Sequence, residues 1–319
     1  NNQAANLDVE TSENSIQESI AQIYIQILYA AESVKVNENT LQVSIAQRDR
    51  GQELLNAGSI AKSDLAQLEA QVSTDRYQLV TAQATLEDYK LQLKQLLELD
   101  GENEMNVYLP ALSDENVLLP LPTKKDVYMS ALTLRPEIEA SKLSVEASEL
   151  GIDIAKAGYL PTISLSAGIG TNHTSGSDFT FGEQVKNGWN NSIGVSVSVP
   201  IFNNRQTKSA VQKAKLQRET SLLSLLDEQK TLYKTIEGLW LDANSAQQRY
   251  AAANEKLRST QISYDLISEQ FNLGMKNTVE LLTEKNNLLQ AQQEQLQAKY
   301  MAILNTQLLK FYQGDKLAL

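Results

Sequence analysis

Apolar residues recur at alternating steps of three and four along most of the chain, a spacing that predicts long amphipathic helices. We expect helices at 7–56, 64–99, 124–157 with an interruption near Pro136, 205–272 and 278–313. The helix that begins at Arg205 extends for about 100 Å at 1.5 Å per residue. A rod of that length does not fit inside a compact globule, so the pattern predicts an extended bundle of helices.

The clearest apolar seam lies between residues 236 and 271 and has the heptad spacing of a left-handed coiled coil. The last helix continues with steps of seven. The first helix starts in the same way but loses its apolar character at Asn37, Ser44 and Arg48. The seam positions are Ile20, Ile23, Ile27, Ala30 and Val34, then Ile236, Leu239, Ala243, Ala246, Tyr250, Ala253, Leu257, Thr260, Tyr264, Ile267 and Phe271, then Leu282, Leu289, Leu296 and Ile303.

Residues 159–202 break the helical pattern, and two stretches within them alternate between apolar residues and small polar ones, a period of two that predicts strands. YLPTISLSAGIGT and NSIGVSVSVPIF each supply about ten residues, the length of a transmembrane strand. Aromatic residues at the ends of such strands are typical of membrane interfaces. The alternative is a soluble hairpin with one buried face. That alternative explains neither the aromatic residues at the strand ends nor the absence of charged residues from the strands. The aromatic residues are Tyr159 and Phe202 at one end, and Phe179, Phe181 and Trp189 towards the other.

The chain also repeats itself at an offset of 216 positions. In this register Ile20 lies on Ile236 and Tyr24 on Trp240, and without a gap Gly58 lies on Gly274 and Asp64 on Glu280. Both copies then continue helically to a glycine, Gly101 in the first and Gly314 in the second. The ordered agreement predicts an internal duplication.

Gly58 and Gly274 each interrupt a helical pattern, where a glycine costs about 1 kcal/mol relative to alanine. We interpret each glycine as the point where a long helix reverses, since glycine accepts a positive φ at a helix C-terminus. Ser63 or Thr278 can then cap the returning helix, with an acid in its first turn. The alternative is a glycine tolerated inside an unbroken helix.

Composition narrows the range of functions. The 319 residues carry a formal net charge of −11, which argues against a nucleic-acid partner. The chain has no cysteine, and its single histidine, His173, lies in a polar run that we expect to be a solvated loop. The acids Glu102 and Glu104 lie in a polar linker and are expected to be solvated. We therefore predict no enzyme activity, no metal site and no cofactor.

These features together resemble the outer-membrane efflux proteins, the TolC-like family. The resemblance rests on LRPEIEASKLSVEASELGIDIAKAGYLPTISLSAG at 134–168, on VSVPIFNN at 197–204 and on FNLGMKNTVELLTEKNNLL at 271–289. It implies a mainly α fold of long antiparallel coiled-coil hairpins that form an α-barrel tunnel, with a transmembrane β-hairpin that contributes to a trimeric β-barrel. It also implies an outer-membrane location, with the helices extending through the periplasm.

The resemblance implies partners and a function as well. The expected assembly is a homotrimer in outer-membrane lipid, with four strands from each protomer in one twelve-stranded barrel. It exports drugs or secreted proteins and is joined to an inner-membrane pump by a periplasmic adaptor protein. Nothing in the first copy corresponds to residues 126–222 of the second, so we expect the chain to be a fragment or the ordered part of a longer protein.

The resemblance also assigns roles to residues near the reversals. It implies a periplasmic gate at Glu280, Asp64 and Lys276, in which the acid lines the closed aperture and the lysine pairs with a neighbouring protomer. A second acid of the family falls on Thr283 here, which leaves a poorer ring of acids. The alternative for Glu280 and Asp64 is that they only complement a helix N-terminus. The tips expected to contact the adaptor are Asn56, Gly58, Ser59, Leu273, Gly274 and Asn277.

We therefore expect five regions along the chain. They are a helical hairpin of the first repeat at 1–101, an equatorial linker at 102–125, a helix of the second repeat at 126–158, a transmembrane β-hairpin at 159–202 and a second helical hairpin with the tail at 203–319. Two other functions remain open from the residues alone. A periplasmic adaptor is also built on coiled-coil hairpins, but needs one hairpin flanked by split β-domains. A structural coiled-coil envelope protein is the other.

Overall fold

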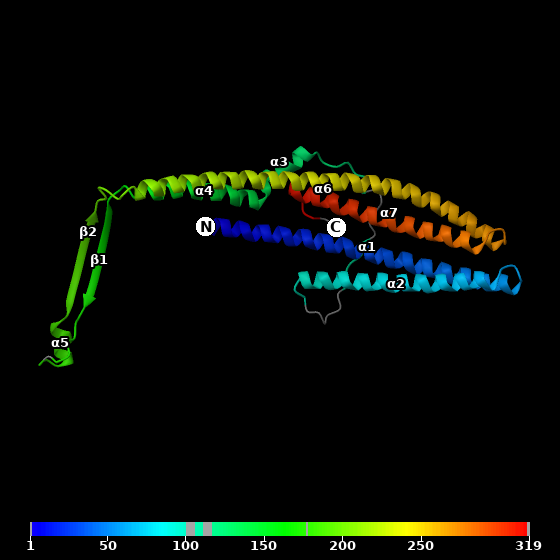
Figure 1. Cartoon of the computed structure of the whole chain (residues 1–319), viewed down its shortest axis with the longest axis horizontal. Helices are drawn as coiled ribbons and strands as arrows, with labels where there is room; N and C mark the ends of the chain where they lie inside the picture. The colour runs from blue at the N-terminus through cyan, green and yellow to red at the C-terminus, as the bar shows by residue number, and fades with distance from the viewer. Residues whose placement is uncertain (1, 100–105, 111–116, 177, 318–319) are drawn as a thin grey trace. The chain divides into compact units, whose positions relative to one another are not determined.

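The computed structural model describes residues 2–99, 106–110, 117–176 and 178–317 (Figure 1). The chain divides into two compact units, residues 1–139 with 229–319, and residues 140–228. Gly101 and the acids Glu102 and Glu104 lie outside the described residues. The elements are α1 (Asn2–Asn56), α2 (Lys62–Leu96), α3 (Lys124–Leu134), α4 (Pro136–Ala157), β1 (Thr162–Gly170), α5 (Phe181–Asn187), β2 (Asn190–Ser198), α6 (Gln206–Asn272) and α7 (Thr278–Gln313).

The predicted helices are present, and their ends support the duplication. Helix α1 ends at Asn56 and α6 ends at Asn272, while α2 begins at Lys62 and α7 begins at Thr278. Both pairs of positions differ by the same 216 residues as the sequence repeat. The uninterrupted α6 has 67 residues, and the predicted break near Pro136 separates α3 from α4. The five-region division of the chain stays a prediction.

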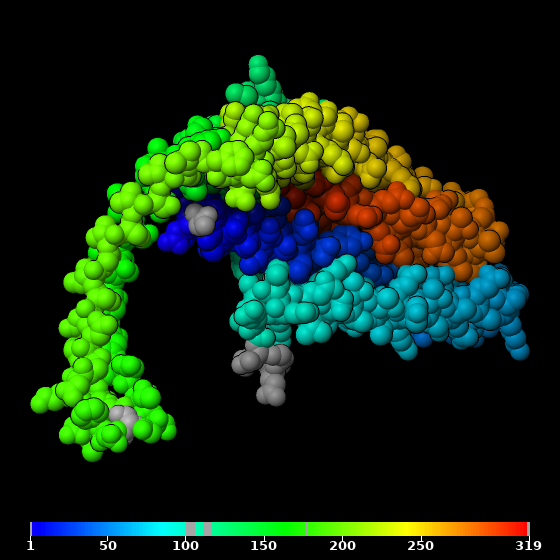
Figure 2. Space-filling model, turned by 60° about the vertical axis from the view of Figure 1, so that its left-hand side comes forward, coloured from blue at the N-terminus to red at the C-terminus, as the bar shows by residue number. Residues whose placement is uncertain are grey.

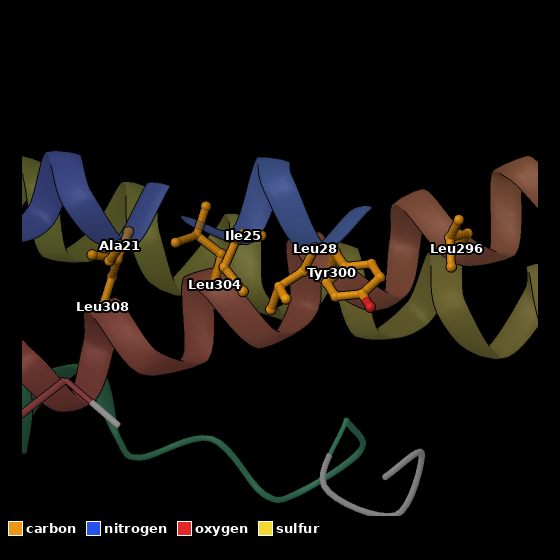
Figure 3. Close-up of a cluster of buried hydrophobic side chains, with 7 residues drawn as sticks. All are labelled: Ala21, Ile25, Leu28, Leu296, Tyr300, Leu304 and Leu308. Atoms are coloured by element: carbon orange, nitrogen blue, oxygen red, sulfur yellow. The ribbon is translucent and has the colours of Figure 1, made fainter. Parts of the chain in front are cut away.

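The first unit is built from two antiparallel helical hairpins, α1 with α2 and α6 with α7 (Figures 1 and 2). Helix α7 also packs along α1, so the two hairpins share one core. The predicted seam positions are buried or half-buried in that core. One apolar cluster of this core joins α1 to α7, as Figure 3 shows. The cluster consists of Ala21, Ile25, Leu28, Leu296, Tyr300, Leu304 and Leu308.

Side chains of α1 and α6 hold the described parts of the linker between α2 and α3 by donating hydrogen bonds to backbone carbonyls of the linker. The Tyr24 hydroxyl donates to the carbonyl of Tyr108 over 2.8 Å, and Trp240 Nε1 donates to the carbonyl of Pro122 over 3.0 Å. Tyr24 and Trp240 are equivalent positions of the repeat. The two copies therefore use one aromatic position to attach two different stretches of the same linker.

A buried arginine occupies the joint between α3 and α4. Arg135 has an extended backbone, as expected before a proline. Its guanidinium lies 3.2 Å from Glu18 and 2.8 Å from Glu137, and its centre is 4.2 Å from the ring of Tyr312. Burial, followed by the effect of Glu18, raises the pKa of Tyr312 to about 12. The cluster connects the joint to the start of α1 and the end of α7.

The two copies end their second helix in the same turn but with different residues. Gly314 follows α7 with φ 101°, and the equivalent position after α2 is Glu98 with φ 52°. In both, the residue after the cap donates to a carbonyl five positions back, Asp315 to Lys310 and Leu99 to Lys94. The prediction that α2 continues to Gly101 is therefore wrong, because Glu98 adopts the left-handed conformation itself.

The second unit consists of the strand hairpin, the helix α5 that connects its strands, and the helical segments that enter and leave it. Residues 140–157 of α4 pair with residues 206–228 of α6 through Arg218, which contacts Glu149 at 2.8 Å, and through the hydroxyls of Ser148 and Ser221, which are 2.8 Å apart. Strands β1 and β2 form an antiparallel pair. Within the described residues, no helix combines the length and apolarity that are needed to cross a bilayer.

Candidate functional site

Both helical hairpins of the first unit reverse at a glycine with a left-handed backbone. Gly58 has φ 78° and Gly274 has φ 74°. At the second tip the Gly274 amide donates to Phe271 over 2.9 Å and the Met275 amide donates to Gln270 over 2.8 Å. The first tip has the same two bonds, 216 positions earlier. These are the two bonds of a Schellman motif, in which glycine is preferred because it has no Cβ. The predicted reversals at both glycines are confirmed.

The N-terminus of α7 is capped by Asn277, with Glu280 as its partner. The Glu280 amide donates to the Asn277 side chain over 2.9 Å, and a Glu280 carboxylate oxygen accepts from the Asn277 amide over 3.3 Å. The prediction that Thr278 caps this helix is therefore wrong. Thr278 is the first residue of α7, and its buried hydroxyl has no partner among the described residues.

Glu280 also pairs with Lys276 of the same chain. Lys276 Nζ lies 2.5 Å from the Glu280 carboxylate, four residues away. The hydrogen bond from Lys276, followed by that from the Asn277 amide, lowers the pKa of Glu280. The structure thus brings together three of the predicted tip and gate residues. In the protomer by itself, the lysine is engaged within its own chain.

The first tip uses an acid in the same place but a different cap. The Ala61 amide donates to the Asp64 carboxylate over 2.9 Å, which corresponds to the bond between Asn277 and Glu280. Ala61 occupies the N-cap position, so the prediction that Ser63 caps α2 is wrong. Ser63 lies inside the first turn of the helix. Both predicted gate acids are therefore third residues of their helices, where a carboxylate satisfies an exposed amide.

The two tips lie beside each other in the first unit. Arg50 Nη2 donates to the carbonyl of Asn272 over 3.1 Å, which links the end of α1 to the end of α6. Beneath them, Leu54 and Leu68 of the first hairpin pack with Phe271 and Leu281 of the second. The tips themselves are exposed, and the second presents two large apolar side chains. Leu273 is 69% exposed and Met275 is 70% exposed.

The strand hairpin has the predicted alternation. Ile163 pairs with Val197, Leu165 with Val195 and Ala167 with Ile193. The interleaved pairs, such as Ser164 with Ser196, form the opposite face. Both strands are exposed along all nine of their residues, and the sheet has two strands within the described part of the chain. An apolar face of this extent, open to solvent, requires a covering that the described residues do not supply.

The predicted interface aromatics lie at the ends of this hairpin and are exposed. Tyr159 and Phe202 stand where the strands meet the helices, while Phe179 and Trp189 flank α5 at the opposite end. His173 is exposed, as predicted, and its Nδ1 lies 3.0 Å from the side chain of Gln184, while its ring contacts Phe181. The interface role of the aromatics stays a prediction.

Two helical hairpins related by an internal repeat, together with an exposed, alternating strand pair, define the class as a mainly helical protein with one strand hairpin. Residues 127–314 match the family model for the outer membrane efflux protein, and the chain therefore belongs to the outer membrane efflux protein family. This finding confirms the predicted family, the mainly α fold class and the outer-membrane location, while the contribution of the strands to a trimeric β-barrel stays a prediction. It is a family of outer-membrane channels, which are not enzymes.

Individual relatives agree with this assignment. The outer membrane efflux protein BepC of Brucella suis is 25% identical over 294 residues, covering 92% of this chain and 61% of BepC. The outer membrane protein TolC of Escherichia coli is 25% identical over 311 residues, covering 93% of this chain and 60% of TolC. The chain spans about three-fifths of the length of these curated relatives.

A solved structure supports the fold in the same way. The CmeC outer membrane channel of Campylobacter jejuni superposes with a TM-score of 0.77 at 20% identity, covering 99% of this chain and 66% of CmeC. At that identity the likeness concerns the fold alone.

Proposed function

We propose that this chain belongs to an outer-membrane exit channel that exports drugs or secreted proteins delivered by an inner-membrane pump. Three copies assemble, their strand hairpins contribute to one transmembrane barrel, and their helical hairpins form a periplasmic tunnel. The observation that carries the proposal is the strand pair with a fully exposed apolar face in a chain of the outer membrane efflux protein family. The adaptor and structural-protein alternatives lose support because the family is that of the channels.

The strand hairpin supports the membrane part of the proposal physically. A lone hairpin in lipid leaves backbone N–H and C=O groups unpaired along both outer edges, at a cost of several kcal/mol per group. Strands from other copies remove that cost by closing the sheet. Ser and Gly on the second face suit a water-filled interior, and the aromatic residues at both ends suit the two interfaces.

The tips support contact with an adaptor. Leu273 and Met275 give the second tip an exposed apolar surface, while Asn56, Gly58 and Ser59 make the first tip small and polar. In this proposal both tips pack against the hairpin tips of a periplasmic adaptor protein. The gate is formed by Glu280, Asp64 and Lys276. A neighbouring protomer that binds Lys276 competes with the contact the lysine makes to Glu280 in its own chain.

The decisive experiment compares arginine on the two faces of β1 in the intact protein. Leu165→Arg places a charge on the apolar face, where an arginine at the bilayer midplane costs about 2–4 kcal/mol. Ser166→Arg places the same charge one residue further, on the Ser and Gly face. We expect Leu165→Arg to prevent insertion into planar bilayers and Ser166→Arg to insert with altered conductance.

The outcome that contradicts the proposal is equally specific. If both variants insert and conduct like the parent, the strands are not in the membrane. Light scattering in mild detergent tests the assembly, because the intact protein must run as a trimer.

The gate is tested separately in the same bilayers. Glu280→Gln is expected to weaken cation selectivity, since three such carboxylates near one axis attract cations. Lys276→Ala is expected to raise conductance, because it removes the contact with a neighbouring protomer that holds the gate closed. An exposed ion pair contributes only about 0–1 kcal/mol. Parental conductance and selectivity in both variants would leave these residues as helix caps only.

A further inference from the structure

A buried polar cluster crosses the first unit where α1, α2 and α7 meet. Lys285 of α7 contacts Asp75 of α2, and their side chains are 4% and 1% exposed. The Ser44 hydroxyl of α1 donates to the same carboxylate oxygen and accepts from Lys285. The other carboxylate oxygen accepts from Gln71 over 2.9 Å. Both oxygens of the buried carboxylate are therefore partnered.

Such a pair is a poor means of stabilising a fold. Removing two charges from water costs several kcal/mol per ion, and replacing a buried ion pair by apolar residues of similar volume is often neutral or stabilising. Burial lowers the pKa of Lys285, and the contact with Asp75 opposes that shift. The best-attested use of buried polar groups in coiled coils is to specify register.

The contact of Ser44 with Lys285 continues the series of apolar contacts between α1 and α7, which we call the contact ladder. In Figure 3, Ala21 lies beside Leu308 and Ile25 beside Leu304. The α1 partner advances four residues while the α7 partner retreats four, as expected of antiparallel helices. Ser44 is 19 residues beyond Ile25, and Lys285 is 19 residues before Leu304. The polar contact is therefore a later step of the contact ladder.

The apolar contacts oppose a change of register only in part. A slip of one heptad, about 10 Å, places Leu28 opposite Leu308, which is again an apolar contact, and places Glu32 opposite Leu304. The same slip moves Lys285 opposite Gly51, which has no side chain to accept its hydrogen bonds. Asp75 is displaced by the same distance, because α2 packs along α1. The slipped state then buries an unpaired ammonium group.

We propose that the contact of Lys285 with Asp75 and Ser44 fixes the register of the second helical hairpin against the first. It thereby sets the height of one tip relative to the other.

The test uses disulfide trapping in the intact protein. The 319 residues contain no cysteine that could pair with the added reporter cysteines. Ala21→Cys with Leu308→Cys reports the observed register, and Leu28→Cys with Leu308→Cys reports the slip of one heptad. Each pair is placed in the parent and in the apolar variant Asp75→Leu with Lys285→Met. We expect the parent to form the first disulfide only, and the apolar variant to form the slipped disulfide at a yield at least about tenfold above the parent.

Two further variants separate register from stability. Asp75→Asn alone leaves the ammonium without a counter-ion and should lower Tm by roughly 10 °C. The exchanged pair Asp75→Lys with Lys285→Asp should restore the parental disulfide pattern. A folded apolar variant with no more slipped disulfide than the parent would overturn the proposal. An apolar variant that does not fold would also overturn it, since the pair would then supply stability rather than register.

Discussion

Replacement of Gly274 by valine tests whether the second tip depends on a left-handed backbone. The Gly274 φ of 74° is a conformation that residues with a Cβ rarely adopt. Nothing lies within 4 Å of a Cβ built at this position, so an added Cβ meets no steric obstacle. The cost of the substitution therefore arises mainly from the backbone conformation. A left-handed residue with a side chain costs about 1–2 kcal/mol, and a β-branched one lies at the upper end.

The expected change in hydrogen-exchange rate follows from the two hydrogen bonds that close the tip. Opening the turn releases the Gly274 and Met275 amides from Phe271 and Gln270. Strain of about 2 kcal/mol in the closed state should accelerate hydrogen exchange at these amides about 30-fold. Gly274→Asn is the matched control, because asparagine tolerates the left-handed region best among residues with side chains. For it we expect an acceleration of about two- to threefold.

Hydrogen exchange measured by mass spectrometry on the intact protein, with fragmentation to single residues, provides the assay. The unchanged tip at Gly58 gives an internal reference in the same molecule. Equal exchange in the valine and asparagine variants would refute the argument from φ. Faster exchange at both tips would also refute it, because the effect would then be global rather than confined to one turn.

Two further predictions concern the ion pairs. Arg135→Met should destabilise the protein by up to about 3 kcal/mol, because Glu18 and Glu137 lose their counter-ion. Arg135→Lys keeps the charge but loses the planar contact with Tyr312, so it should cost less. Equal Tm values for the two variants would contradict this prediction. The lowered pKa of Glu280 means that its stabilising effect is present above the ordinary carboxyl pKa and is lost as pH falls through the lowered value. The difference in Tm between the parent and Glu280→Gln should therefore be present at pH 7 and vanish in acid, and a difference that grows on acidification would contradict the sign.

The sequence was most informative where one residue type has a single physical use. Gly58 and Gly274 interrupt helical patterns, which favoured a reversal over a glycine tolerated inside an unbroken helix. The strand alternation at 162–170 and 190–198 admitted one register of faces. Caps were less certain, because Asn277 and Thr278 are adjacent and both have side chains that can accept from an amide. Only the backbone geometry shows that Asn277 is the N-cap.

The buried polar cluster was missed for a different reason. Ser44 appeared as a weak point of the first seam, since a polar residue at a seam position reduces the apolar signal. Its partners, Asp75 and Lys285, lie 31 and 241 positions away, and nothing local associates the three. A seam position that is polar, with an acid and a base at seam positions of neighbouring helices, is the signal that would have indicated the cluster.

The two copies of the repeat differ in the residue that follows their second helix. Gly314 and Glu98 occupy the same left-handed cap, but only Gly314 is crowded, since a Cβ there would lie 2.6 Å from Leu134 Cδ1. Glu98 is exposed, so Glu98→Gly removes strain without uncovering a buried contact. Relief of about 1–2 kcal/mol, less the added entropy of the unfolded chain, predicts a net gain of about 0.5–1 kcal/mol. The Leu99 amide, which bonds to Lys94, should then exchange about two- to fivefold more slowly. Gly314→Ala should have the opposite effect and make the Asp315 amide exchange faster. Faster exchange at Leu99 in Glu98→Gly would contradict the prediction, because it would show that the glutamate side chain stabilises the cap by more than its backbone strain costs.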